Sequence, residues 1–260
     1  MSLDIVTADQ RLADATVKGQ VWGPAGVGKT TLLKTLDPAT TLCGSVEGGL
    51  LSVQRADEFG PRFMGETIEP ATWPEIKAIT EGFKQRPEAL AKYKTVFWDS
   101  TSVISHKCLA WCQTQPEAFS EKNGKPEIRG AYGLLAREIV AWAWDWKHMR
   151  GVNVWLVGGL EYKENDIGIK EPVPLLAGAK LVAELPYIMD FVLVMDRFKA
   201  ADGNWYTGLH TDPRGAYRSV PVKTRGGGFE PIEQPHLGKF MAKALGFSPT
   251  TAAPPSAIAA

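Results

Sequence analysis

Apolar and polar positions along the chain form two kinds of segment, which alternate. Short apolar runs have the length of buried strands and lie at 17–22, 41–46, 93–98, 152–160 and 189–195. The longer segments between them predict helices at 73–86, 131–149 and 234–247, with a further helix that ends near 115. Residues 205–210 and 217–222 are predicted as an antiparallel pair. This alternation predicts an α/β fold with a mainly parallel sheet flanked by helices and a C-terminal antiparallel strand pair.

Prolines, glycines and polar residues indicate where the loops and domain limits lie. Segments 116–130 and 161–176 each contain two prolines among charged residues, and we expect loops there and across most of 50–68. Residues 248–260 are mainly small residues and prolines, which is typical of disorder. We therefore expect an N-terminal extension over 1–16, one core over 17–247 and a disordered tail over 248–260.

The segment GPAGVGKT at 23–30 matches the phosphate-binding pattern G-x-x-x-x-G-K-[ST]. It lies between a predicted strand and a predicted helix that starts at Thr31. Glycines let successive N–H groups point inward at phosphate oxygens, and the start of the helix presents its positive dipole end. Lys29 would contact the β- and γ-phosphates, and the Thr30 hydroxyl would hold Mg²⁺. The predicted nucleotide-binding residues are Gly23, Pro24, Ala25, Gly26, Val27, Gly28, Lys29, Thr30 and Thr31. The alternative is a glycine-rich turn that binds no ligand.

Two acidic residues follow predicted strands at the edge where the phosphate loop also begins. Parallel sheets gather their functional groups at the carboxyl ends of the strands, so Asp99 is expected to face Lys29 and to hold Mg²⁺. The alternative role for Asp99 is to cap the next helix. Glu47 ends the strand at 41–46, and its carboxylate could deprotonate the attacking water. The alternative for Glu47 is a solvated acid in a turn.

Lys223 and Arg225 lie on one face after the run at 217–222 and precede three glycines. Two cations on one face could reach a γ-phosphate, and their late position in the chain allows that phosphate to belong to a neighbouring subunit. The alternative is a pair of exposed basic residues that protects an edge strand from aggregation.

Composition limits the remaining possibilities. The 29 basic residues balance 29 acidic residues, so overall charge gives no argument for nucleic-acid binding, although a local basic strip remains possible. Cys43, Cys108 and Cys112 have no metal-ligand pattern around them and are interpreted as reduced core thiols. The polar, acid-containing start of the chain argues against a signal peptide, and no apolar run approaches a membrane span of about 20 residues.

The order of these motifs resembles a known family. The strand–GPAGVGKT–helix unit, SVEGG at 45–49, VFWDST at 96–101 and the late K-x-R resemble the RecA/KaiC-type core of P-loop ATPases. The chain is most similar to the phage RecA-like proteins of the Sak single-strand-annealing group, over about residues 17–245. VWLVG at 154–158 and AELPYIMDFV at 183–192 also resemble that group.

The resemblance implies roles for individual residues. Lys29 and Thr30 match the Walker A pair, Asp99 matches the Walker B aspartate, and Glu47 matches the glutamate that activates water. Lys223 and Arg225 match a pair that reaches the nucleotide of a neighbouring subunit, which implies a homo-oligomer. Relatives often carry a polar sensor after the strand at 152–157, where this chain has Gly158-Gly159-Leu160-Glu161, so Glu161 is the candidate here.

The resemblance also implies single-stranded DNA as a partner and the cytoplasm of a bacterial host as the location. The two polar loops would be the DNA-binding segments, and they offer lysines beside Phe119, Tyr132 and Tyr162. On composition alone they are solvated loops. We therefore expect a Mg²⁺-dependent ATPase that acts on single-stranded DNA in phage recombination or annealing. The main alternative is a nucleotide-dependent assembly or switch ATPase with protein partners and no DNA; a small-molecule phosphotransferase ranks below both.

Overall fold

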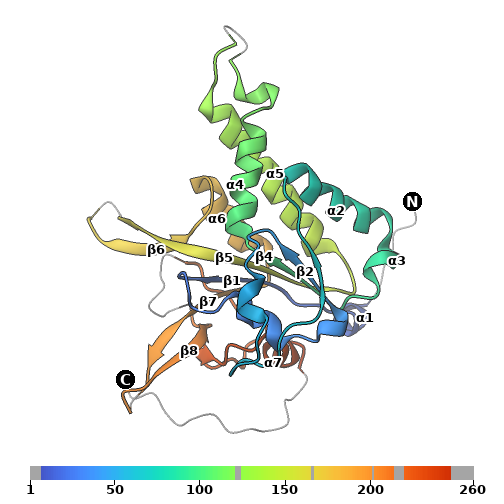
Figure 1. Ribbon diagram of the computed structural model, residues 1–260, viewed down its shortest axis with the longest axis vertical. Coiled ribbons are helices and arrows are strands. Elements are labelled where there is room, and N and C mark those ends of the chain that lie inside the picture. The colour runs from blue at the N-terminus through green and yellow to red at the C-terminus, as the bar shows by residue number, and fades with distance from the viewer. Residues whose placement is uncertain (1–6, 121–123, 165–166, 201, 214–219, 247–260) are drawn as a thin grey trace.

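A single twisted sheet forms the centre of the protein (Figure 1). The computed structural model describes residues 7–120, 124–164, 167–200, 202–213 and 220–246. Neighbouring strands follow the order β3-β2-β4-β5-β1-β7-β8-β9, and β6 pairs with β5 off this path. The strands are β1 Lys18–Gly23, β2 Thr41–Ser45, β3 Glu66–Ile68, β4 Thr95–Asp99, β5 Asn153–Glu164, β6 Lys170–Pro174, β7 Phe191–Lys199, β8 Trp205–His210 and β9 Ile232–Glu233. The six strands from β3 to β7 along this order pair in parallel, whereas β6, β8 and β9 pair antiparallel.

Helices cover both faces of the sheet. The α-helices are α1 Ala8–Ala13, α2 Trp73–Gln85, α3 Pro87–Leu90, α4 Thr101–Cys112, α5 Ile128–His148, α6 Ala179–Ile188 and α7 Leu237–Ala244. Residues of α2, α4, α5 and α6 share one hydrophobic core with one face of the sheet. The other face packs against α7 and the 3₁₀ helix η1 Thr30–Thr35. Shorter 3₁₀ helices are η2 Pro38–Thr40, η3 Leu50–Val53 and η4 Pro116–Ala118. The predicted α/β class, with its antiparallel C-terminal strands, is confirmed.

Tryptophan side chains pass over glycines on neighbouring strands of the sheet. Trp22 pairs with Gly158, Trp98 with Gly44, and Trp155 with Gly19, each as Cα partners in the register. A Cβ atom added to any of the three glycines would lie 2.2 Å from an indole carbon of its partner. Each glycine therefore leaves the space in which a large aromatic ring lies flat against the sheet.

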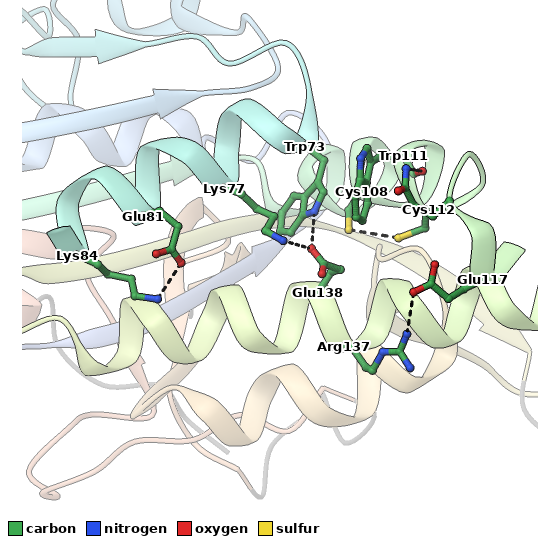
Figure 2. A network of polar contacts seen from close by, with 11 residues as sticks. Trp73, Lys77, Glu81, Lys84, Cys108, Trp111, Cys112, Glu117, Arg137 and Glu138 are labelled. Atoms are coloured by element: carbon green, nitrogen blue, oxygen red, sulfur yellow. Dashed lines mark hydrogen bonds and ion pairs between the residues drawn. The ribbon is translucent and has the colours of Figure 1, made fainter.

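Polar contacts join α2 to α5, and α4 packs over the same face of the sheet as these two helices (Figure 2). The carboxylate of Glu138 on α5 accepts from the indole N–H of Trp73 at 2.9 Å and from the Lys77 ammonium at 2.7 Å, both on α2. On α4, the sulfur atoms of Cys108 and Cys112 lie 3.9 Å apart, as buried free thiols. Burial raises the pKa of both thiols, which agrees with the interpretation of these cysteines as core residues.

The structure differs from the local sequence predictions at three places. The polar segment 161–176 is not a loop: β5 continues to Glu164 and forms an antiparallel hairpin with β6, because Tyr162 pairs with Pro172 and Leu160 with Pro174. Strand β8 does not pair with 220–222, the described part of the segment predicted as its partner. Its partners are β7 and β9, residues 220–222 form no strand, and residues 217–219 lie outside the described ranges. The helix α6 was not predicted, and its internal Pro186 weakens the helical pattern there. The expected tail at 248–260 lies outside the described residues.

Candidate nucleotide-binding site

The phosphate loop leaves the carboxyl end of β1, which runs between β5 and β7 in the middle of the sheet. Gly26 and Gly28 have φ angles of +74° and +101°, a conformation that other residues rarely adopt. Gly23 approaches β7 so closely that an added Cβ would lie 2.6 Å from the carbonyl oxygen of Met195. The Val27 side chain is buried in the core, whereas Ala25 and Gly26 are exposed. Of Val27, only the backbone can therefore face a ligand.

The helix expected after the loop is shorter and tighter than predicted. Residues Thr30–Thr35 form a six-residue 3₁₀ helix, with Thr31 N–H bonded to Gly28 oxygen at 3.0 Å and Leu32 N–H to Lys29 oxygen at 3.1 Å. A helix this short carries little of the macrodipole that the sequence suggested. Recognition of phosphate at this position therefore depends on the loop amides and on Lys29.

The Lys29 ammonium lies over the loop that precedes it. Its Nζ donates to the carbonyl oxygens of Gly23 at 3.0 Å and Pro24 at 2.8 Å. Burial lowers the pKa of Lys29, and the nearby carboxylates of Asp99 and Glu47 oppose that shift. Lys29 therefore lies within the field of both acids, although they belong to other strands.

The hydroxyl of Thr30 contacts the carboxylate of Asp99 directly. Thr30 Oγ1 donates to Asp99 Oδ2 at 2.6 Å, across 69 positions of sequence. Asp99 ends β4, is 3% exposed, and has a pKa raised to about 6. Burial is the main cause; the Thr30 hydrogen bond opposes it, and the charge of Glu47 adds to it. Few interactions within the chain offset the cost of burying the charge of this carboxylate, so it is suited to hold a cation.

Glu47 lies on the neighbouring strand end, beside Asp99. The N–H groups of Val46 and Glu47 both point to the carbonyl oxygen of Asp99, at 2.6 and 3.3 Å. The Ser100 hydroxyl donates to Glu47 Oε1 at 2.6 Å. Ser100 also caps α4 by accepting from Val103 N–H, so Ser100, and not Asp99, makes the side-chain cap of that helix.

On its other side, the phosphate loop borders residues that the sequence did not single out. A hollow of about 310 Å³ is lined by 24–27 of the loop together with Asp196 and Arg197 of β7. The sequence carries no motif at these two positions. They reach the loop because β7 is the parallel neighbour of β1 and extends beyond it. Only the strand order, which local pattern does not give, could have pointed to them.

Lys223 and Arg225 do not join this site within one chain. Lys223 pairs with Val192 near the start of β7, and its ammonium donates to the Pro186 oxygen at 3.0 Å. Arg225 forms an ion pair with Asp190 at 2.9 Å. The backbone of Asp190 bonds to Lys18 at the start of β1, so this group lies at the amino end of the strand whose carboxyl end carries the phosphate loop.

Two projections extend from the core (Figure 1). One is formed by the end of α4 and the start of α5, and the other by the hairpin of β5 and β6. Their exposed aromatic side chains are Phe119 at 40%, Tyr132 at 38% and Tyr162 at 64%. Tyr132, Lys163 and Lys180 line a second hollow, of about 360 Å³, between α5, β5 and α6. Glu161 pairs with Lys163 at 2.8 Å.

In the part of the chain that the structure describes, no group of three or more histidine, cysteine, aspartate or glutamate side chains is arranged to hold a metal. No helix in the same ranges is both long and apolar enough to cross a membrane.

Comparison with known proteins identifies the family of this chain. No curated protein sequence matches the chain. Among solved structures, a prototypical ATPase from the type III secretion system of pathogenic bacteria is 12% identical, with a TM-score of 0.39; the match covers 69% of this chain and 51% of that one. The chain thus spans about half the length of that ATPase. The model of the AAA domain family AAA_24 matches residues 15–221, which is most of the chain. The chain therefore belongs to the AAA_24 family of AAA domains, and its segment at 23–30 is a P-loop motif.

Proposed function

We propose that this protein hydrolyses ATP with Mg²⁺ and acts on single-stranded DNA, in the manner implied by its resemblance to the phage Sak-type RecA-like proteins. The observation that carries the hydrolytic part is the contact of Thr30 with Asp99 at 2.6 Å, with Glu47 beside it and Lys29 within reach of both acids. These four side chains come from the ends of three strands and together provide what phosphoryl transfer needs.

Thr30 and Asp99 would hold Mg²⁺ between the protein and the phosphates. The ion would supply positive charge to the β- and γ-phosphate oxygens. In this arrangement the Thr30 hydroxyl would turn from Asp99 toward the ion, and the Asp99 carboxylate, which is mainly ionised at neutral pH, would face it. Lys29 would leave the carbonyl oxygens of Gly23 and Pro24 and donate instead to the phosphates.

Glu47 is suited to prepare the attacking water. Its carboxylate is held by the Ser100 hydroxyl through one oxygen, Oε1, which leaves Oε2 available to accept a proton. The water oxygen would form a bond to the γ-phosphorus while the bond to the bridging oxygen of ADP breaks. The proton of the water passes to Glu47, and the electron pair of the broken bond stays on ADP.

A site shared between subunits accounts for Lys223 and Arg225. In one chain they lie at the far end of β1 from the phosphate loop, so they cannot assist its own nucleotide. The Arg225 side chain is nevertheless 64% exposed despite its ion pair with Asp190. We propose that it reaches the γ-phosphate bound by a neighbouring copy, where an arginine typically raises turnover by a factor of about 10³ to 10⁵.

The two projections and the hollow beside them support the DNA assignment. Proteins that bind single strands without sequence preference combine cations along the backbone path with aromatic rings on which bases stack. Tyr132, Lys163 and Lys180 meet in the larger hollow, and Tyr162 extends from the adjoining hairpin. The neutral overall charge means that such a path has to be local.

The first test is nucleotide binding by Lys29→Ala. Removing the ammonium takes away a charge-assisted contact with each of two phosphates, so we expect affinity for a fluorescent ATP analogue to fall by about 100-fold or more. Lys92→Ala is the matched control, because Lys92 is an exposed lysine paired with Glu66 at the other edge of the sheet. Equal affinity of Lys29→Ala and wild type would overturn the proposed site.

The second test separates the DNA role from the ATPase. We expect single-stranded DNA to raise ATP turnover, and the Lys163→Ala/Lys180→Ala double variant to bind DNA more weakly. Its plot of log affinity against log salt should be shallower by about 1.4, the sum of two lost phosphate contacts. Turnover that is insensitive to DNA, with no DNA binding by wild type, would sink the DNA role and leave an assembly or switch ATPase.

A further inference from the structure

The hollow beside the phosphate loop lies on the side away from the metal-binding groups. Strand β1, which carries the loop, has β5 on one side and β7 on the other. Asp99 and Glu47 follow β4 and β2, which lie beyond β5. The hollow is lined instead by 24–27 of the loop and by two residues of β7. A nucleotide whose γ-phosphate lay near Thr30 and Asp99 would therefore have room for its nucleoside end beside β7.

Arg197 is placed at that nucleoside end by the alternation of β7. Side chains two positions apart share a face of a strand, so Arg197 follows Leu193 and Met195, which are buried on the face that η1 covers. The Met195 methyl group lies 3.4 Å from where a Cβ of Gly28 would be, directly below the loop. Arg197 is the next residue on this face and is exposed.

The backbone at Arg197 is fixed while its side chain is open. Its N–H donates to Asp196 Oδ1 at 2.7 Å, and Arg197 pairs with Thr207 in the β7–β8 ladder. Within the described ranges the guanidinium forms none of the ion pairs seen for other cations. A planar cation that a fixed strand carries beside a hollow of about 310 Å³ is suited to bind a flat, electron-rich group.

We infer that Arg197 binds the nucleoside end of the nucleotide, with its guanidinium stacked on the base. This inference rests on the proposed function, since it needs a triphosphate in the loop. It assigns to β7 a part in nucleotide affinity that no motif in the chain indicates. The phosphates would then be held by the loop and Lys29, and the base by a strand on the opposite side of β1.

The experiment compares two ligands that differ only by the nucleoside. Binding of ATP and of inorganic tripolyphosphate is measured by competition against a fluorescent ATP analogue, for wild type, Arg197→Ala and Arg197→Lys. We expect both variants to bind ATP about tenfold more weakly and tripolyphosphate as wild type does, because lysine keeps the charge but cannot stack as a planar group. Lys199→Ala, on the same strand but outside the hollow, should behave as wild type for both ligands.

The other outcomes of this experiment would overturn either the stacking role of Arg197 or the proposed function. Unchanged ATP affinity in Arg197→Ala, or full rescue by lysine, overturns the stacking role. An equal loss for ATP and tripolyphosphate shows that Arg197 acts on phosphate and also overturns it. If wild type binds neither ligand, the proposed function itself fails, and that result is distinct from the others because it precedes any substitution.

Discussion

Asp99 is the residue at which stability and function oppose each other. It is nearly inaccessible to water, and burial raises its pKa from 3.8 to about 6. At neutral pH the chain therefore holds a desolvated carboxylate whose nearest direct partner is a neutral hydroxyl. Such a charge destabilises the chain alone and is compensated when a cation binds. This conflict makes the free energy of unfolding depend on pH in a direction that can be measured.

The prediction concerns Asp99→Asn without nucleotide or metal. The folded chain binds the Asp99 proton more tightly than the unfolded chain, so wild-type stability falls as pH rises from about 4 to about 6 and stays lower above it. Asparagine cannot ionise, and its oxygen can still accept from Thr30. The difference in free energy of unfolding between the variant and wild type should change with pH. From pH 3.5 to pH 8 we expect it to move in favour of the variant by up to about 3 kcal/mol, at about 1.4 kcal/mol per pKa unit. Urea unfolding at the two pH values measures this difference.

Ligand should shift the comparison of the two proteins in favour of wild type. Mg²⁺ and ATP stabilise the state that binds them, so they should raise the melting temperature of wild type more than that of Asp99→Asn. A stability difference between the variant and wild type that is the same at pH 3.5 and at pH 8 without ligand would contradict the electrostatic account. In that case Asp99 would titrate alike in the folded and the unfolded chain.

At the scale of elements, the parallel sheet depends on glycine–tryptophan pairs across its strands. We predict that Gly44→Ala destabilises the protein by about 1–3 kcal/mol or more, because its Cβ would lie 2.2 Å from the Trp98 ring. Trp98 cannot retreat easily, since it packs edge to face with Trp142 and Trp146 at 5.7 and 5.8 Å. Thermal and denaturant unfolding measure the effect.

Gly133→Ala is the matched control for this prediction. Gly133 lies within α5, its φ is not positive, and an added Cβ would meet nothing within 4 Å. Alanine favours helix over glycine by about 1 kcal/mol, so this variant should be more stable than wild type. If both alanine variants shift stability in the same direction, packing against Trp98 is not what requires glycine at 44.

The spacing of apolar residues along the chain predicted the elements well where a single helical or strand spacing dominates. It predicted them poorly where pairing between strands determines the structure. The strands that became β1, β2, β4, β5 and β7 and the helices α2, α4 and α5 have clear runs or spacing, and the structure contains them. The hairpin of β5 and β6 was read as a loop because Pro172 and Pro174 suggest a break. These prolines are tolerated because β6 has β5 as its one partner in the described sheet.

The sequence predicts those parts of the candidate site that lie in a contiguous motif or directly after an apolar strand. The phosphate loop is a contiguous motif, and the position of Asp99 after an apolar strand suggested its direction. The meeting of Asp99 with Thr30 follows from that rule and from the parallel pairing. The order of strands does not appear in local sequence, so the position of Arg197 beside the loop could not be foreseen. Nor could the placement of Arg225 at the opposite end of β1.

At the scale of the whole molecule, Arg225 and the phosphate loop of the same chain lie at opposite ends of β1. This separation leads to a prediction about assembly. If Arg225 acts on a neighbouring subunit, Arg225→Ala should bind ATP as wild type does and turn over at least about 100-fold more slowly. Glu47→Gln should also bind ATP and fail to turn over, because an amide cannot accept the proton of the attacking water. Each variant keeps the group that the other lacks.

Mixing the two inactive variants therefore provides the decisive measurement. At an interface where the phosphate loop and Glu47 come from Arg225→Ala and the arginine comes from Glu47→Gln, every catalytic group is present. We expect an equal mixture to recover up to about a quarter of wild-type turnover, since random mixing places the right pair at one interface in four. The recovery should depend on protein concentration and vanish on dilution, as association requires. A mixture that remains as inactive as its parts, while light scattering shows that both variants assemble, would place the action of Arg225 outside the neighbouring site.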